Sequence, residues 1–225
     1  MFDNISVTIL KANSNFMKKK TIALVLSLVS VVVILNMACQ KSANGGSDQP
    51  DTPAGWPTLP STPYDYEHAN DNMPQYIKDV LNSHPEMDNT PADNPITNNG
   101  ATLGRVLFYD KSLSFNNTIA CASCHHQDKA FVDGDARSTG FEGGLTRRNP
   151  MPLANLRYQR TKAMFWDKRA ATLEAQVLMP IQDHIEMGMP SLTALEDKVK
   201  SKPYYASLFQ KAFGSTDITS DRISK

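Results

Sequence analysis

The sequence has no surplus of charge, no internal repeat and no stretch with the alternation of a β-strand. Its 225 residues contain 23 Lys and Arg against 23 Asp and Glu, and this balance argues against nucleic-acid binding, which needs a basic face. No segment alternates polar and apolar residues at period two, the pattern of a half-buried strand. The apolar patterns that are present have helical spacing, so the sequence predicts an all-α fold.

Four segments carry apolar residues at the three-and-four spacing of a buried helix face. We expect helices over residues 102–109, over residues 167–179 with Pro180 as the stop, from about Ser191, and from Pro203 to Gly214. In the third of these, Thr193 and Glu196 have the spacing of a capping box. Residues 127–160 form a long connection with little periodicity, and a loop of that length is usually functional. Wrapping a large flat cofactor would explain it.

The first 39 residues have the pattern of an export signal. Three consecutive lysines precede an apolar run over residues 22–35, which is shorter than the roughly 20 residues that a membrane-spanning helix needs. The run leads to Cys39 in a context that resembles a bacterial lipoprotein signal, so we expect a lipid anchor at Cys39. An ordinary cleaved signal and an uncleaved anchor are the alternatives. All three place the rest of the chain outside the cytoplasm, in a periplasmic or similar compartment.

The export segment, residues 1–39, is followed by a stretch that cannot form a core. Residues 40–66 are rich in Pro, Gly and small polar residues, which bury too little apolar surface to offset their ordering entropy. They predict a disordered tether between the anchor and a folded domain over residues 67–225.

Cysteine is scarce, with three in the chain. Cys39 belongs to the export signal, which leaves Cys121 and Cys124 in the stretch CASCHH. A zinc knuckle, a redox dithiol and a haem clamp share this pattern, but zinc needs four ligands, and a thioredoxin-like dithiol needs an α/β context. The sequence offers neither. The remaining interpretation is covalent haem attachment, with thioether bonds from Cys121 and Cys124 and His125 as axial ligand of the iron.

The ligand on the other side of the iron decides between an electron carrier and an enzyme. A methionine or histidine there makes a low-spin electron-transfer haem, whereas an open position admits peroxide. Four residues are far enough downstream to reach around the ring: Met179, His184, Met187 and Met189. Core packing is the alternative role for Met179.

Three further residues favour an enzyme. Gln176 lies on or beside the apolar stripe of its helix, and a buried amide needs a partner or a function. Glu186 is the one carboxylate in the apolar stretch HIEMGMP, where it could move a proton to and from peroxide. Trp166 lies in the aromatic stretch MFWDKRA. A surface carboxylate and a core tryptophan are the alternative interpretations of Glu186 and Trp166.

These residues together resemble a known family, the bacterial dihaem cytochrome c peroxidases and their methylamine-utilisation relatives of the MauG type. The resemblance covers most of residues 100–213. It is carried by LGRVLFYDKSLS (103–114), CASCHHQDKAFVDG (121–134), RRNPMPLAN (147–155), FWDKRAATLEAQVLMPI (165–181) and EMG (186–188). The fold that it implies is a cytochrome c-like haem domain with long irregular loops.

The resemblance also implies roles for single residues. Cys121, Cys124 and His125 would hold the peroxidatic haem. Glu186 would be the acid–base residue, Gln176 its companion in the distal pocket, and Trp166 a step on the electron path between two haems. Asn149 matches the position that ligates an interdomain calcium ion, although the prolines nearby are displaced.

The sequence departs from the family pattern in two ways that matter. Classical members cap the resting iron with a histidine shortly after the haem motif, and here no histidine occurs between His126 and His184. We therefore expect a five-coordinate iron at rest that needs no reductive activation, as in the MauG-type branch. The family also carries a second CxxCH in a C-terminal domain, whereas this chain ends at DITSDRISK. We therefore expect a fragment whose second haem domain is missing, and loss of the electron-storing haem from the protein is the alternative.

The resulting expectation is an exported cytochrome-c peroxidase. It would reduce hydrogen peroxide with electrons from a small cytochrome c or similar donor, and the family makes a homodimer an option. The alternatives are a MauG-like oxidase of an organic or protein substrate, and a non-enzymatic electron-transfer cytochrome with Met187 or His184 on the iron.

Overall fold

The computed structural model describes residues 55–225 of the chain. The expected export segment, its lipidation site Cys39 and residues 40–54 of the expected tether lie outside the described residues. Within them the regular structure is helical, apart from isolated antiparallel bridges such as the one between Met164 and Ala170. The all-α class is therefore confirmed. No helix of this part is long and apolar enough to cross a membrane.

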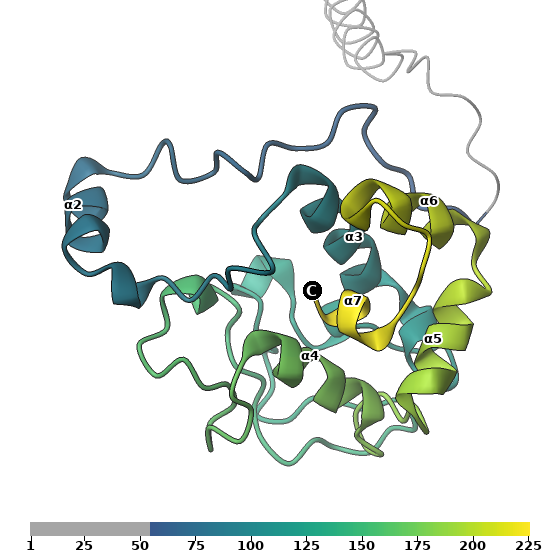
Figure 1. Cartoon of the computed structure of the whole chain (residues 1–225). Helices are drawn as coiled ribbons and strands as arrows, with labels where there is room; N and C mark the ends of the chain where they lie inside the picture. The colour runs from purple at the N-terminus through teal and green to yellow at the C-terminus, as the bar shows by residue number, and fades with distance from the viewer. Residues whose placement is uncertain (1–54) are drawn as a thin grey trace, which may run out of the picture. The chain divides into compact units, whose positions relative to one another are not determined.

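Six α-helices lie within the described residues, and Figure 1 labels them. In chain order they are α2 (Gln75–Ser83), α3 (Asn98–Tyr109), α4 (Leu173–Gln182), α5 (Leu192–Lys200), α6 (Pro203–Phe213) and α7 (Ser220–Ser224). Helix α3 contacts α6, α5 contacts α6 and α7, and α4 contacts α7. The hydrophobic core lies among these helices, and its fully buried side chains include Leu195, Val199, Tyr205 and Phe209.

Three of the four expected helices are confirmed, with small differences at their starts. Helix α3 begins four residues earlier than its apolar pattern, because Thr97 caps it by accepting the Gly100 amide at 3.0 Å. Helix α5 is capped by Ser191, which accepts the Ala194 amide, and not by Thr193. The capping-box expectation was wrong because Thr193 already lies within the helix. Helix α6 ends at Gly214 in the left-handed conformation, as expected.

The second expected helix was wrong at both ends. Residues 164–170 fold back on themselves instead, with Met164 and Ala170 paired across a tight turn in which Phe165 and Lys168 have positive φ. Helix α4 begins only after Thr172, whose hydroxyl accepts the Ala175 amide at 3.1 Å. Pro180 does not stop the helix, because a proline removes one backbone donor without preventing the next amide from closing a turn.

The long connection from residue 127 to α4 is irregular, as expected, and its only helices are single 3-10 turns. It is tied to the preceding segment by Arg157, which makes a bidentate ion pair with Asp88 at 2.6–3.1 Å. The Asn89 amide donates to the Arg157 carbonyl at 2.9 Å. These bonds fix one edge of the loop against the segment after α2.

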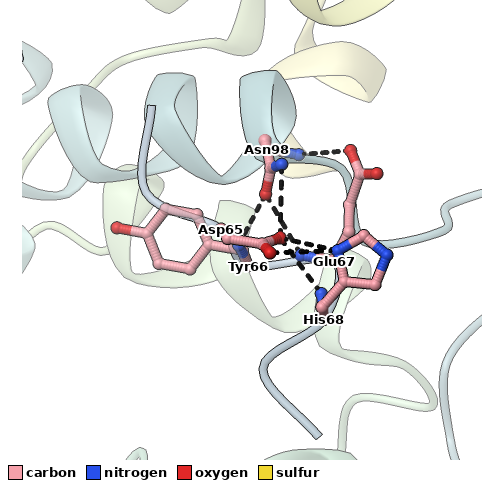
Figure 2. Close-up of polar contacts among 5 residues, drawn as sticks. All are labelled: Asp65, Tyr66, Glu67, His68 and Asn98. Atoms are coloured by element: carbon pink, nitrogen blue, oxygen red, sulfur yellow. Dashed lines mark hydrogen bonds and ion pairs between the residues drawn. The ribbon is translucent and has the colours of Figure 1, made fainter. Parts of the chain in front are cut away.

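The segment before α2 is fastened to the start of α3, as Figure 2 shows. The Asn98 side-chain oxygen accepts the amides of Tyr66 and Glu67, and the Glu67 carboxylate accepts the Asn98 amide at 2.9 Å. Asp65 accepts from the backbone and ring of His68. The last residues of the expected tether therefore contact the helical domain.

The residues that lead into the CASCHH stretch are pinned to the core by polar contacts. Asp110, directly after α3, accepts hydrogen bonds from the phenols of Tyr204 and Tyr205 at 3.2 and 2.7 Å. Lys198 of α5 donates to the carbonyls of Ser114 and Phe115. Because a buried polar group is costly to leave unpaired, these contacts fix the path of the chain toward Cys121.

Candidate haem site

One large cavity, of about 950 Å³, opens among the irregular segments and α4. Its walls come from residues near 119–125, 138–153, 164–169 and 173–187. The residues that the sequence assigned to haem attachment, catalysis or calcium binding within the described part of the chain all line this cavity: Cys121, Cys124, His125, Asn149, Trp166, Gln176 and Glu186. The fold thus brings together residues that are up to 65 positions apart in the sequence (186 − 121).

The two cysteines sit on one tight turn. Residues Cys121–Ser123 form a 3-10 turn, and the amides of Cys124 and His125 both donate to the Cys121 carbonyl, at 3.1 and 3.0 Å. Helix α3 contacts this turn. Both thiols are free, and burial raises the pKa of the Cys121 thiol to about 11 and also raises that of Cys124. Redox dithiols have lowered pKa values, so this environment speaks against the dithiol interpretation.

The imidazole of His125 is oriented by the backbone. Its Nδ1 lies 2.8 Å from the Phe131 carbonyl oxygen, and since that oxygen can only accept, Nδ1 carries the proton and Nε2 is the free ligand nitrogen. Ala130 and Phe131 both have positive φ, 56° and 60°, which turns this carbonyl back toward the histidine. Burial lowers the pKa of His125, and a neutral imidazole is the form that binds a metal.

These residues fit a covalently bound haem. The thiols and the imidazole come from one turn at the wall of the cavity, as two thioethers and an axial ligand require. Much of the remaining wall is apolar, including Phe108, Ile119, Leu153 and Val177, which suits a large flat ring. We therefore regard this cavity as the candidate haem site.

Glu186 is a half-buried carboxylate that lines the cavity without a partner. Among residues 55–225 its side chain takes part in no hydrogen bond or ion pair, while its backbone is bonded on both sides. Burial raises the pKa of Glu186, the nearby charge of Asp183 adds to the rise, and Arg169 and Arg147 oppose it. A carboxyl group with a raised pKa and free oxygens is suited to taking up and returning a proton.

Close backbone packing holds the segment around Glu186. Gly140 approaches so closely that a Cβ there would overlap the Ile185 carbonyl, and a Cβ on Gly188 would overlap the Phe141 ring. The Phe141 amide donates to the Glu186 carbonyl at 3.0 Å. Glycine is therefore required at position 140 for steric reasons, and the loop around it forms one wall behind Glu186.

This packing gives a test of the wall. Gly140→Ala is expected to destabilise the protein by about 1–3 kcal/mol, because the added methyl group must push back the Ile185 carbonyl. Gly104→Ala on α3 is the matched control, since a Cβ there meets no atom within 4 Å, and it should stabilise by roughly 0.5–1 kcal/mol. Thermal unfolding of both variants measures the difference. Equal melting temperatures would contradict this packing.

Gln176 and Trp166 also lie at the cavity, in different settings. Gln176 on α4 is half-buried, and its carboxamide has no hydrogen-bond partner within the described part of the chain, so it remains available to a ligand. Trp166 is 58% exposed, so it is not the core residue that its aromatic context allowed. Its indole Nε1 donates to the Asn149 carbonyl at 2.9 Å, which fixes the ring at the cavity wall.

Asn149 offers little to a cation from this chain alone. Its carbonyl accepts from Trp166, and its Nδ2 donates to the Asp135 carbonyl at 2.7 Å, which leaves the side-chain oxygen. Calcium takes six to eight oxygen ligands, and residues 55–225 contain no group of three His, Cys, Asp or Glu side chains that could hold a metal. A calcium ion here would need most of its ligands from elsewhere, and this site stays a prediction.

The four residues considered as a second iron ligand differ in burial and in their position relative to the cavity. Met187 and Met189 are buried in the core, at 4% and 2% exposure. Met187 also lines the cavity, whereas Met189 does not. His184 is exposed and Met179 is 38% exposed, and both line the cavity. The side chains of His184 and Met179 form no hydrogen bond within the described residues, so no such bond fixes either of them in the cavity.

Known proteins share this arrangement. A helical domain with a CxxCH turn at the wall of one large cavity is typical of c-type haem domains. Residues 98–225 match the family model of the di-haem cytochrome c peroxidases, and the chain belongs to this family. Membership of this family implies covalently bound haem c, in agreement with the CxxCH turn.

Individual relatives fall in both branches of the family. The methylamine utilization protein MauG of Methylorubrum extorquens is 41% identical over 134 residues, which are 59% of this chain and 37% of that protein. The cytochrome c551 peroxidase of Nitrosomonas europaea is 36% identical over 124 residues, 55% of this chain and 36% of that protein. This chain thus spans little more than a third of the length of these relatives.

A solved structure supports the fold. The crystal structure of a MauG-like protein associated with microbial copper homeostasis matches 61% of this chain and 42% of its own chain, with a TM-score of 0.55 and 34% identity. The sequence-based assignment to the dihaem peroxidases and MauG-type proteins is thereby confirmed, together with the cytochrome c-like fold class.

Proposed function

We propose that this chain is the peroxidatic haem domain of an exported enzyme that reduces hydrogen peroxide to water. The observation that carries the proposal is the half-buried Glu186 carboxylate, which has a raised pKa, lacks a partner among the described residues and shares one cavity with the CxxCH turn. Electron transfer alone requires no proton-transfer group beside the haem.

The haem would be held by three residues of one turn. Cys121 and Cys124 would each form a thioether, and His125 would bind the iron through Nε2 while Nδ1 donates to Phe131. Haem iron supplies the change of oxidation state that a two-electron reduction requires. The Phe131 hydrogen bond fixes the tautomer and the direction of the imidazole.

Glu186 would move the protons. As the carboxylate it would accept a proton from one oxygen of hydrogen peroxide, and it would return that proton to the other oxygen as the O–O bond breaks. The proton that Glu186 moves belongs to the peroxide itself. Conversion of one peroxide into two waters takes up two electrons and two further protons, and both of these protons must come from solvent. The unpartnered carboxamide of Gln176 would hold and orient the peroxide in the cavity.

The electrons would come from outside this domain. A small cytochrome c or similar donor would supply them through a second haem, which we expect in a C-terminal domain beyond this chain. Trp166, fixed at the cavity wall by its bond to Asn149, would lie on that path. Export with a lipid anchor at Cys39, placement outside the cytoplasm and a homodimer belong to the same proposal.

The second candidate function is oxidation of an organic or protein substrate, with peroxide as the oxidant. The 41% identity to a MauG protein favours it. Both functions use the same haem, Glu186 and Gln176, and they differ in where the electrons originate.

Steady-state assays of the haem-loaded protein test the proposal. Peroxide consumption is measured with a reduced small cytochrome c and with an artificial one-electron reductant that reaches the haem directly. Turnover with the artificial reductant is expected even where the second haem is absent. Absence of peroxide consumption with either reductant would contradict the proposed function.

A further inference from the structure

The segment that carries Glu186 is organised by one neighbouring side chain. The Asp183 carboxylate oxygen Oδ1 accepts the amide of Ile185 at 2.8 Å and the amide of Glu186 at 3.2 Å. The Asp183 carbonyl accepts the Gly188 amide at 2.9 Å. A single residue thus binds three amides of the turn over residues 183–188.

Asp183 is itself firmly placed. It is the residue directly after α4, and its amide donates to the carbonyls of Met179 and Pro180 at 3.0 and 3.3 Å. It lines the cavity and is half-buried. Within residues 55–225 its carboxylate forms no ion pair with a Lys, Arg or His side chain. Its oxygen Oδ1 therefore binds the amides of the turn without competition from a cationic side chain.

The far side of the same turn is held by the backbone. The Glu186 carbonyl accepts from the Phe141 amide at 3.0 Å, and the Met187 carbonyl accepts from the Phe115 amide at 2.8 Å. The Glu186 main chain is thus fixed at both its N–H and its C=O, while its side chain has no partner in the described part of the molecule. A fixed stem with a free carboxylate is what a proton-transfer residue needs.

We propose that Asp183 is the positioning residue of this site, and that its two side-chain hydrogen bonds determine where the Glu186 carboxylate stands in the cavity. The proposal rests on the proposed function of Glu186. Without the Asp183 side-chain oxygen the amides of Ile185 and Glu186 lose their acceptor. The backbone bonds of residue 183, Phe141 and Phe115 would still hold the turn, but none of them fixes these two amides.

Two substitutions at one position separate hydrogen bonding from charge. Asp183→Asn keeps a side-chain oxygen that accepts the same two amides and removes the charge, whereas Asp183→Ala removes both. We expect Asp183→Ala to lower kcat/KM for peroxide by roughly tenfold to a hundredfold, because a small displacement of a catalytic group has a large effect on rate. Asp183→Asn should retain most of the activity.

Amide hydrogen exchange gives a readout that does not depend on activity. In the haem-loaded protein, the amides of Ile185 and Glu186 should exchange about tenfold faster in Asp183→Ala and near the wild-type rate in Asp183→Asn. Ser191→Ala, which removes a comparable acceptor at the start of α5, is the control for general destabilisation and should leave these two amides and the turnover unchanged.

Each outcome decides one question. Unchanged amide exchange at residues 185 and 186 in Asp183→Ala would overturn the positioning role. An equal loss of turnover in Asp183→Asn and Asp183→Ala would also overturn it, because charge would then be the relevant property of Asp183. Failure of the proposed function is distinguishable, because it would leave turnover insensitive to Glu186→Gln while the exchange result still reports on the turn.

Discussion

Glu186→Gln is expected to lower kcat for peroxide reduction by about a hundredfold to ten-thousandfold, the usual contribution of a positioned general acid–base group. Glutamine has nearly the same shape but cannot accept and return a proton at neutral pH. The measurement is peroxide turnover of the haem-loaded variant with an artificial reductant. Glu142→Gln, an exposed carboxylate outside the cavity lining, is the matched control and should keep wild-type activity.

The pH dependence of the wild type gives a second check on the same residue. Because burial raises the pKa of Glu186, the acidic limb of the rate profile should lie above the ordinary glutamate value of about 4.3, and Glu186→Gln should remove it. Activity in the variant equal to wild type across the profile would show that Glu186 moves no proton in the reaction.

The same substitution should increase stability at neutral pH. A carboxyl group whose pKa is raised by folding opposes folding once the pH exceeds that raised value, and it has no effect below its unfolded pKa, where both states are protonated. Glu186→Gln should therefore raise the melting temperature at pH 7 and leave it unchanged near pH 4. A gain in stability combined with a loss of activity is typical of a functional residue.

Replacing both cysteines of the haem motif is expected to abolish covalent haem attachment. In Cys121→Ser/Cys124→Ser no thioether can form, so haem should be lost on a denaturing gel, and the mass of the polypeptide should fall by one haem. The protein should also unfold at a lower temperature, since a group bound only to the native state stabilises it. Each single variant should retain one thioether and a weaker haem signal.

The third cysteine provides the control for this experiment. Cys39→Ser should retain covalent haem, and in the exporting host it should lose the lipid anchor and appear in the soluble fraction. Covalent haem that persists in the double variant would contradict the role of Cys121 and Cys124. Membrane association that persists in Cys39→Ser would contradict the lipoprotein prediction alone.

The candidate haem motif was predictable from local spacing, because Cys121, Cys124 and His125 lie on one turn. The regular helices α3, α5 and α6 were also predictable, since their buried faces follow sequence periodicity. The start of α4 was misplaced because residues 164–170 form a local turn that pairs Met164 with Ala170, and the helical spacing of apolar residues does not reveal such a turn. Proline at 180 was read as a stop, although here the helix continues to Gln182.

The rest of the site depended on information that spacing does not carry. Sequence context singled out Glu186 and Trp166, and the family resemblance implied their roles. Only the structure shows that Glu186 is half-buried and Trp166 exposed. The Phe131 carbonyl could not be anticipated, because residue type does not encode where a carbonyl points. Asp183 had a weak signal, since an Asp often accepts from amides two or three residues further along the chain. The predicted helix end at residue 179 hid its place directly after α4.

The most direct test of the central claim is the optical and electron paramagnetic resonance spectrum of the haem-loaded protein at rest and after peroxide is added. We expect a high-spin, five-coordinate iron at rest whose spectrum changes rapidly with peroxide in the wild type and slowly in Glu186→Gln. A low-spin iron with histidine or methionine on both sides, indifferent to peroxide, would contradict the account and identify the domain as an electron carrier.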